Sequence, residues 1–409
     1  MKQSFVNNSL LLLLIISKTT AALLLLLICS VIVEVSEVAA AAVYTTNSNS
    51  VLFSPSYTWY RRKTRKKVDD KDVGATIPLE TITTNHTFHQ VYKNFNTRPA
   101  WKAPKFIWRY SFKLHTLAMK VFLHRFDTLT KSLPNSSLSL QIVWWKALQT
   151  TNVIAAAWSY DLLPTYSRWI VGRRIFKFFF PPLSSANIDL RTSFIDTRIN
   201  DTIKQVRDRD PNTSIRLVTL GAGYDLRSVR LLNTKEEAND GEDNMLKIQS
   251  AIEIDLETVV QGKKMLLESK RFQRRRPNCI LPETMVGIDL NEDSDVLKSK
   301  LDLILNGSSS SKRKNVFTIF VLEGILVHLE SGSSSRVLEV LSTILKKTND
   351  NRDNNNNNCC CLIFADCIEG ITNRSLQDAK CTLHKTGWEL IEFVANPTRA
   401  PHFGVAYPN

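Results

Sequence analysis

The stretch Arg216–Arg230, RLVTLGAGYDLRSVR, decides the fold of this 409-residue chain. Its first part, up to Leu220, is an apolar run of strand length, and Gly221 and Gly223 then form a turn. Apolar residues at helical spacing follow. A strand that ends in glycines and continues into a helix exposes backbone N–H groups at the carboxyl edge of a sheet, where nucleotide-like ligands bind. The third glycine of the dinucleotide fingerprint is missing, because Leu226 stands at its position.

Each of the next four predicted strands ends on an acidic residue. The strands are expected over residues 251–254, 285–288, 316–322 and 361–365, and the acids are Asp255, Asp289, Glu323 and Asp366. Because the carboxyl ends of parallel strands meet at one edge of a sheet, we expect these side chains to line the edge where a cofactor lies. In a doubly wound sheet the acid beside the glycine turn accepts the ribose hydroxyls, and Asp255 has that position.

Five motifs, in the same order, resemble those of the leucine carboxyl methyltransferase family. They are RTSFIDTRI, VTLGAGYDLRSVRL, EIDLETVVQGKK, GIDL and FVLEGILVHLESGSSSRVLEVL. The chain looks closest to the bacterial branch of S-adenosylmethionine-dependent O-methyltransferases, over roughly residues 145–404. The resemblance implies an α/β fold of the Rossmann-like class I methyltransferase type: a mostly parallel, seven-stranded sheet with helices on both faces and an N-terminal helical cap.

The resemblance also implies S-adenosylmethionine as the cofactor and assigns the contacts of its methionine part. Arg191 pairs with the carboxylate, Gly221 and Gly223 pass under the methionine, and Glu323 lies by the amino group. The chemistry agrees, since an arginine fork suits a carboxylate and a glutamate suits an ammonium.

The nucleoside part is assigned in the same way. Asp255 holds the ribose, and Asp289 with Leu290 lies by the adenine. The chain departs from the family at two positions, because Leu322 replaces a small residue and His328 stands where a tyrosine is common.

Methyl transfer is a displacement at a sulfonium carbon, so the leaving thioether needs no proton. Catalysis then rests on alignment of the acceptor and exclusion of water. A carboxylate acceptor needs no base, whereas a phenol or alcohol does, and His328 or Asp225 could supply one. A lone histidine after an apolar run is more often structural, and Asp225 is equally suited to cap the following helix. The acceptor, a small molecule or a protein, and the oligomeric state are left open.

The motifs leave two alternatives to a methyltransferase of the EC 2.1.1 type. An NAD(P)-binding Rossmann oxidoreductase would lack its third glycine and a Tyr-x-x-x-Lys pair, and would leave Arg191 and Glu323 without a role. A non-catalytic, membrane-tethered module of the same fold has no reason to keep Arg191, Asp255 and Glu323 together. Both alternatives therefore explain fewer residues.

The basic residues and the cysteines of the chain bear on whether it binds nucleic acid or metal. The formal net charge is +14, but the basic clusters are scattered at residues 61–67, 271–276 and 312–314 without interleaved aromatic residues, so nucleic acid is not an expected partner. Seven cysteines include the adjacent Cys359–Cys361, and the chain has no paired C-x-x-C motif. No metal site is therefore expected. Cys361 and Cys367 are predicted to be buried thiols.

Four regions are predicted along the chain. They are a signal peptide or membrane anchor (1–43), a disordered basic linker (44–104), a helical cap region (105–187) and the S-adenosylmethionine-binding domain (188–409). The leader holds two apolar runs, Leu10–Ile16 and Ala21–Val33, each shorter than the ~20 residues of a spanning helix. We expect a secretory route or membrane attachment, with organelle targeting as a third alternative.

Low-complexity stretches and the chain end complete the predictions. Residues 306–315 and 348–358 are expected to be disordered loops between strands and helices. The final strand of the resembling family is not visible after Tyr407, which predicts a trimmed or rebuilt end.

Overall fold

The computed structural model of the chain describes residues 139–140, 142–143, 146–147, 153–163, 182–234, 247–306, 316–350, 360–371, 375–395 and 402–409. The predicted leader, the basic linker and most of the cap region lie outside these residues. Within the described part, no helix is both long enough and apolar enough to cross a membrane.

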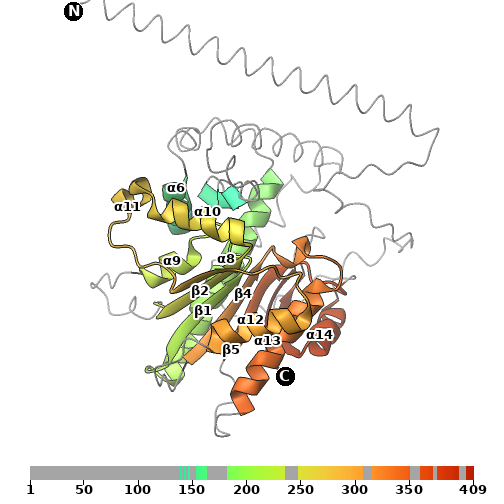
Figure 1. Ribbon diagram of the computed structural model, residues 1–409. Coiled ribbons are helices and arrows are strands. Elements are labelled where there is room, and N and C mark those ends of the chain that lie inside the picture. Colours follow the sequence, from blue (N-terminus) through green and yellow to red (C-terminus); the bar gives the residue numbers. More distant parts are fainter. Residues whose placement is uncertain are drawn as a thin grey trace, which may run out of the picture. The chain divides into compact units, whose positions relative to one another are not determined.

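Seven strands form one sheet in the order β3-β2-β1-β4-β5-β7-β6 (Figure 1). They are β1 (Ser214–Leu220), β2 (Ser250–Asp255), β3 (Thr284–Gly287), β4 (Val316–Glu323), β5 (Cys360–Asp366), β6 (Trp388–Val394) and β7 (His402–Pro408). All neighbouring strands are parallel except the two pairs that include β7. The strand order reverses between β1 and β4, and open α/β sheets bind ligands at the carboxyl edge of such a point. The predicted α/β, mostly parallel sheet is confirmed.

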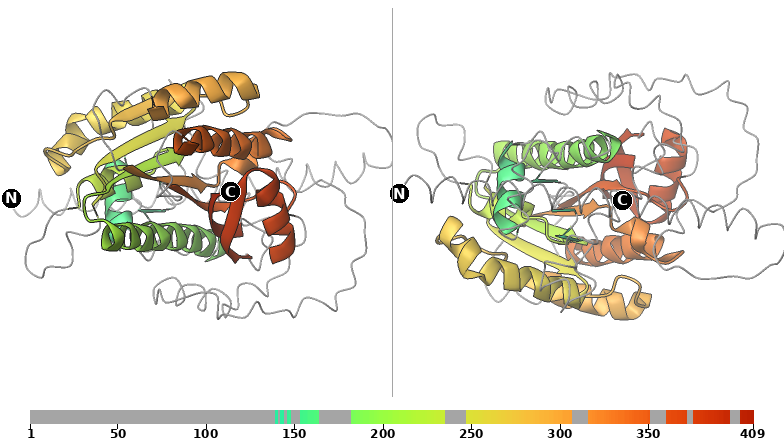
Figure 2. Two further views of the ribbon diagram at one scale, coloured as in Figure 1. Left: turned by 90° about the horizontal axis from the view of Figure 1, so that it is seen from below. Right: turned by 90° about the horizontal axis from the view of Figure 1, so that it is seen from above.

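Helices lie on both sides of the sheet, with α8 on one side and α13 on the other (Figure 2). The helical elements are α6 (Val153–Leu162), α8 (Pro182–Arg209), α9 (Arg227–Leu232), α10 (Glu257–Glu268), α11 (Lys270–Arg275), α12 (Ser294–Asn306), the 3₁₀ turn η7 (Leu326–His328), α13 (Ser333–Asp350) and α14 (Leu376–Lys385). The fold is therefore Rossmann-like, as the motifs predicted.

Buried apolar side chains alternate between the two faces of the sheet and form a hydrophobic core on each face. On β1, Ile215 and Leu217 are buried with residues of α8, whereas Val218 and Leu220 are buried with residues of α12 and α13. Successive side chains of a strand point to opposite faces, so one short run supports both helical layers. All seven residues of β5 are buried, as in a strand covered on both faces.

The prediction for the chain end was wrong. The final strand does not lie beyond Tyr407, because β7 includes that residue and pairs antiparallel with both β5 and β6. Gly404 lies opposite Phe364 in the register, and a Cβ on Gly404 would overlap the Phe364 ring. Because a glycine interrupts the strand and its first five residues are all buried, β7 lacks the alternating pattern that marks a strand in the sequence.

Two further predictions need local correction. α13 continues to Asp350, so the stretch predicted as a loop from Thr348 begins as helix, and residues 351–359 lie outside the described part of the chain. Cys361 is fully buried as predicted, but Cys367 is only partly buried. Burial raises the pKa of both thiols to about 12.

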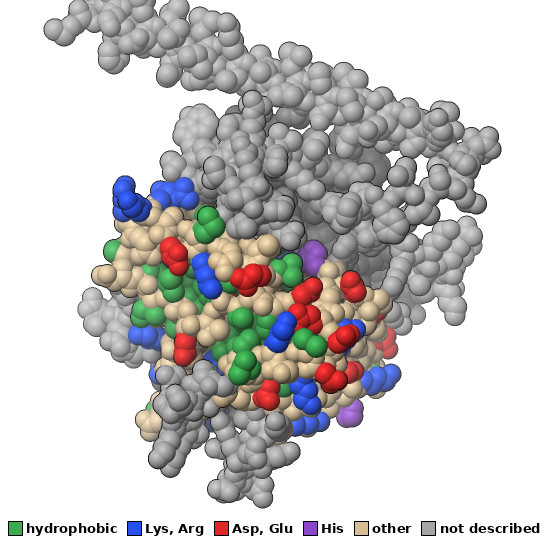
Figure 3. Space-filling model, in the orientation of Figure 1, with side chains coloured by type: hydrophobic (Ala, Val, Ile, Leu, Met, Phe, Trp, Pro, Cys, Tyr) green, Lys and Arg blue, Asp and Glu red, His purple; other side chains and the backbone are tan. Residues whose placement is uncertain are grey.

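One basic cluster of the sequence has a structural role. Arg276 Nη2 lies 2.9 Å from Asp161 Oδ2, and the guanidinium carbon of Arg276 lies 4.1 Å from the centroid of the Trp158 ring. Arg275 donates to the backbone oxygen of Asp161. These contacts attach α6 to the α11 region. On the face shown in Figure 3, acidic and basic side chains are interspersed over the described residues.

Replacing Trp388 tests whether the C-terminal hairpin is integral to the domain. Its indole is fully buried and donates from Nε1 to the backbone oxygen of Leu338 at 2.9 Å, which joins β6 to α13. We expect Trp388→Phe to lower the free energy of unfolding by about 2 kcal/mol, since it removes a buried hydrogen bond and leaves a cavity. Denaturant unfolding measures the change. The exposed neighbour variant Glu389→Gln should stay within about 0.5 kcal/mol of wild type. Equal stability of all three proteins would contradict the packing of β6.

Candidate functional site

The glycine turn after β1 has a backbone that other residues rarely adopt. Gly221 and Gly223 have φ values of +67° and +49°, in the left-handed region. The N–H of Gly221 donates to the backbone oxygen of Ile254 at 2.8 Å, which joins the turn to the end of β2. A Cβ on Gly221 would overlap the side chain of Ile325. Gly221 therefore lets the turn after β4 pack closely against the turn after β1.

Asp255 connects the glycine turn to the next strand. One carboxylate oxygen accepts the N–H of Gly223 at 2.7 Å, and the other accepts the N–H of Leu256 at 2.7 Å. Burial raises the pKa of Asp255, and these two amide hydrogen bonds offset part of the rise. The sequence-predicted pair of a glycine and an acid is thus in direct contact.

Asp289 and Leu290 follow β3 and differ in exposure. The backbone oxygen of Asp255 accepts the N–H of Ile288 at 2.8 Å, which places Asp289 at the same edge. Asp289 is exposed, whereas the Leu290 side chain is 3% exposed and packs in the core with α12 and α13.

Beside the glycine turn lies a group of charged side chains, here named the ion-pair cluster: Lys146, Arg191, Asp196, Asp225, Arg227, Arg230 and Glu323. Its centre is the buried Arg227, at the start of α9. The guanidinium reaches Asp196 at 2.6 Å, Asp225 at 2.7 Å and Glu323 at 2.8 Å. Arg227 stands in the glycine-turn motif, but no local pattern predicted that its guanidinium also binds Asp196 and Glu323, which are 31 and 96 residues away in the chain.

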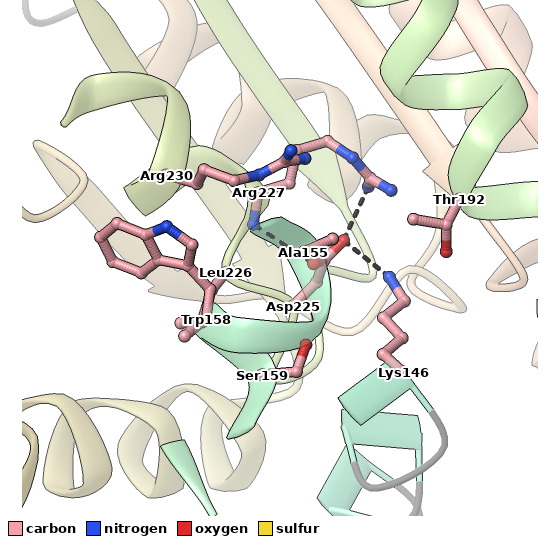
Figure 4. Close-up of a pocket in the computed structure, with 9 residues that line it drawn as sticks. All are labelled: Lys146, Ala155, Trp158, Ser159, Thr192, Asp225, Leu226, Arg227 and Arg230. Carbon is pink, nitrogen blue, oxygen red and sulfur yellow. Dashed lines mark hydrogen bonds and ion pairs between the residues drawn. The ribbon is translucent and has the colours of Figure 1, made fainter. Parts of the chain in front are cut away.

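Lys146 is a second cation that the sequence did not single out. It comes from a helical stretch before α6, and its side chain is only 3% exposed. Its Nζ lies 2.9 Å from Asp225 and 3.3 Å from the carboxylate of Glu323, and Figure 4 shows Asp225 between Lys146 and Arg227. A buried ammonium needs such partners, because removal from water is costly.

The ion-pair cluster is closely packed on the side that faces α6. Lys146, Thr192, Asp225 and Arg227 help to line a cavity of about 10 Å³, which holds one water at most (Figure 4).

Arg191 and Glu323, predicted from separate motifs, meet in the structure. Arg191 Nη2 lies 3.6 Å from Glu323 Oε1, which is the longest ion pair among the described residues. Arg191 Nε and Glu323 Oε1 are buried and form no hydrogen bond with the described residues. Gly324 has a φ of +67°, and a Cβ there would lie 2.9 Å from Arg191 Nη1. The two predicted methionine ligands therefore lie side by side with hydrogen-bonding capacity left over.

The charge balance of the ion-pair cluster fits an amino-acid group. Its four cations face three carboxylates, which leaves one surplus positive charge. Burial alone would raise the pKa of Glu323, but Lys146, Arg227 and Arg191 outweigh burial and lower it. Glu323 is therefore ionised at neutral pH. A surplus cation beside an ionised carboxylate suits a bound carboxylate and a bound ammonium, the two charges of the methionine part of S-adenosylmethionine.

Asp225 is a poor candidate for a base. Burial raises its pKa, but Arg227 and Lys146 more than compensate and hold the pKa well below its usual range. Its Oδ1 accepts the N–H of Arg227, the first residue of α9, at 3.2 Å, while Leu226 is the N-cap residue. Of the two roles that the sequence allowed, the structure favours a structural one at the start of α9, although Asp225 is not the N-cap residue itself.

His328 is exposed at the end of η7. Partial burial and the charge of Arg191 lower its pKa below the ordinary value of 6.5, while Asp255 opposes them. η7 follows the carboxyl end of β4, so His328 lies at the same edge of the sheet as Glu323, and its lowered pKa leaves the imidazole mostly neutral at pH 7.

Asp366 does not line the open edge, which corrects the prediction for the acid after β5. It is fully buried, and its Oδ2 accepts the N–H groups of Ile325 at 2.6 Å and Leu326 at 2.9 Å. β5 ends beneath the turn that follows β4, so this carboxylate faces protein backbone.

A doubly wound sheet with a glycine turn, an acid after β2 and an amino-acid-like charge pattern at its carboxyl edge defines a class I methyltransferase, which uses S-adenosylmethionine. Residues 178–342 match the family model described as leucine carboxyl methyltransferase. This match over residues 178–342 confirms the resemblance drawn from the five motifs, all of which lie within it.

Solved structures that are similar to the chain match it at low sequence identity. Magnesium protoporphyrin IX methyltransferase from Synechocystis PCC 6803 with bound S-adenosylmethionine is 12% identical, with a TM-score of 0.32 over 63% of this chain and 97% of that chain. LepI in complex with S-adenosylmethionine is 10% identical, with a TM-score of 0.32 over 72% and 67%. An O-methyltransferase family protein from Burkholderia thailandensis is 8% identical, with a TM-score of 0.28 over 55% and 60%. Likenesses this weak identify no ligand. No curated protein sequence matches the chain.

Arg191→Ala and Asp255→Ala should each weaken the binding of S-adenosylhomocysteine about tenfold or more, because a hydrogen bond to a charged group contributes about 1.5–3 kcal/mol. Isothermal calorimetry measures the affinity. Arg198→Ala is the matched control, since Arg198 lies on the same helix but pairs with Glu392 of β6 at 2.6 Å. Wild-type affinity in both site variants would contradict the assignment of these residues.

Proposed function

We propose that the protein transfers the methyl group of S-adenosylmethionine to an oxygen atom of an acceptor that carries a hydroxyl or carboxylate group. The observation that carries the proposal is the juxtaposition of Arg191 and Glu323 beside the glycine turn, with one surplus positive charge in the ion-pair cluster. Acceptors of this kind are small molecules or protein side chains and termini.

Each half of the cofactor has residues suited to it. Arg191 would hold the carboxylate, Glu323 the ammonium and Asp255 the ribose. Bound there, S-adenosylmethionine supplies a methyl group activated on a sulfonium. The chain itself contributes alignment and exclusion of water, since the thioether that leaves takes no proton. The low exposure of Lys146 and Glu323 supports this account, because charged contacts are stronger away from water.

His328 favours a hydroxyl acceptor. A neutral imidazole at the rim of the site can take the proton of a phenol or alcohol during attack on the methyl group. A carboxylate acceptor is already ionised at neutral pH and would leave His328 without a proton to accept. The hydroxyl acceptor is therefore the first choice within the proposal.

The rate of methyl transfer should depend on pH through His328. With a hydroxyl acceptor, kcat/KM should be highest where His328 is neutral and should fall as the pH drops through a pKa below 6.5, since protonation removes the base. His328→Gln should lower kcat/KM by about 10²-fold or more and abolish this acidic fall. Transfer of labelled methyl to a panel of hydroxyl and carboxylate acceptors measures both.

His384→Gln is the matched control, since His384 is exposed on α14, and it should keep the wild-type profile. A full-rate His328→Gln enzyme on every acceptor would remove His328 as the base. Rapid transfer to carboxylates alone would support the carboxylate form of the proposal.

We also propose that residues 1–43 send the chain into the secretory route or anchor it to a membrane, on the strength of their two apolar runs. A fluorescent protein fused behind residues 1–60 should co-sediment with membranes or be cleaved and secreted. Leu25→Arg with Leu26→Arg in the same fusion should abolish either outcome, because charges in the longer apolar run oppose insertion. A wild-type fusion that stays diffuse would contradict this proposal.

A further inference from the structure

Asp366 is a buried carboxylate that the proposed chemistry does not use. Four backbone N–H groups converge on it: those of Ile325 at 2.6 Å, Leu326 at 2.9 Å, Val327 at 3.3 Å and Cys367 at 2.8 Å. Three of these donors belong to the turn between β4 and α13. The carboxylate thus accepts hydrogen bonds from N–H groups at the start of the 3₁₀ turn η7, where a helical turn offers no backbone acceptor.

The turn that Asp366 holds carries predicted site residues at both ends. Glu323 ends β4, Gly324 follows with its N–H bonded to the backbone oxygen of Ala365 at 3.1 Å, and His328 ends η7. The N–H of His328 donates to the backbone oxygen of Ile325 at 2.8 Å, so the histidine is attached to the segment that Asp366 binds.

The same turn packs against the other parts of the site. The side chain of Ile325 lies where Gly221 lacks a Cβ, and Arg191 Nη1 lies close to the Cα of Gly324. A shift of the turn would therefore move Glu323 and His328 relative to the glycine turn and to Arg191. Since interiors are closely packed, a small displacement cannot be absorbed without loss of these contacts.

The arrangement needs a side chain that offers two acceptor oxygens to the four N–H groups. Burial raises its pKa, and the amide hydrogen bonds oppose that rise. An ionised carboxylate can accept from all four N–H groups, whereas an asparagine would turn its own N–H₂ group towards some of these donors.

We propose that Asp366 is a positioning residue of the methyl-transfer site: through the three amides of residues 325–327 it fixes the turn that carries Glu323 and His328. The inference rests on the proposed function, because it takes Glu323 as the partner of the cofactor ammonium and His328 as the base.

Asp366→Asn tests the role in the full-length protein. We expect its affinity for S-adenosylhomocysteine to fall about tenfold or more, the effect of one lost hydrogen bond to a charged group. Hydrogen exchange of the peptide spanning residues 323–330 should become faster than in wild type. Asp210→Asn is the matched control, since Asp210 also holds a turn, through the N–H of Asn212 and the hydroxyl of Thr213, but at the opposite edge of the sheet. It should bind within about twofold of wild type.

Wild-type binding of S-adenosylhomocysteine is measured first, which separates the two claims. No binding by wild type would overturn the proposed function. Wild-type affinity in a folded Asp366→Asn protein would overturn the positioning role alone.

If Asp366→Asn does not fold, hydrogen exchange of the wild-type protein decides. Slow exchange of the amides of residues 325–327, slowed further by S-adenosylhomocysteine, would support the role. Exchange as fast as in an exposed loop would overturn it.

Discussion

The guanidinium of Arg227 holds together three carboxylates from three parts of the chain: Asp196 from α8, Asp225 from the glycine turn and Glu323 from the end of β4. Each nitrogen of the planar fork has its own partner, so the three elements are fixed in relative position as well as in distance. Burial of the fork excludes water as a substitute for any one partner. Loss of a buried partner of this kind costs about 3–5 kcal/mol, which is a large part of the stability of a domain. The geometry of Glu323, and with it the predicted ammonium site, depends on this one side chain.

Two turns meet over the point where the strand order reverses, and both depend on glycine. Gly221 leaves room for Ile325 from the turn after β4, and Gly324 leaves room for Arg191 from α8. A carboxylate stabilises each turn through hydrogen bonds to its backbone. Asp255 accepts the N–H of Gly223 in the turn after β1, and Asp366 accepts N–H groups of the turn after β4. The carboxyl edge of the sheet is therefore shaped before any ligand binds, as catalysis by alignment requires.

The sequence predicted what depends on local pattern. The apolar run before Gly221, the acids after the strands and the order of the motifs were enough for the sheet, and the structure brings Arg191 to Glu323. Features that depend on long-range packing were missed. Lys146 lies 79 residues from Asp225 in the chain, and nothing around it marks a buried cation. Asp366 follows a strand just as Asp255 does, so the local sequence predicts the same role for both. In the structure, however, the turn after β4 packs on Asp366 and its N–H groups occupy the carboxylate. β7 was missed because burial on both sides removes its alternation.

The central claim is that this edge of the sheet recognises the amino-acid and nucleoside parts of S-adenosylmethionine. Calorimetric titration of the full-length protein with S-adenosylhomocysteine, and separately with NADH, tests it most directly. The account predicts micromolar affinity for the first ligand and no binding of the second. Binding of NADH without binding of S-adenosylhomocysteine would contradict it and favour a dinucleotide-dependent oxidoreductase.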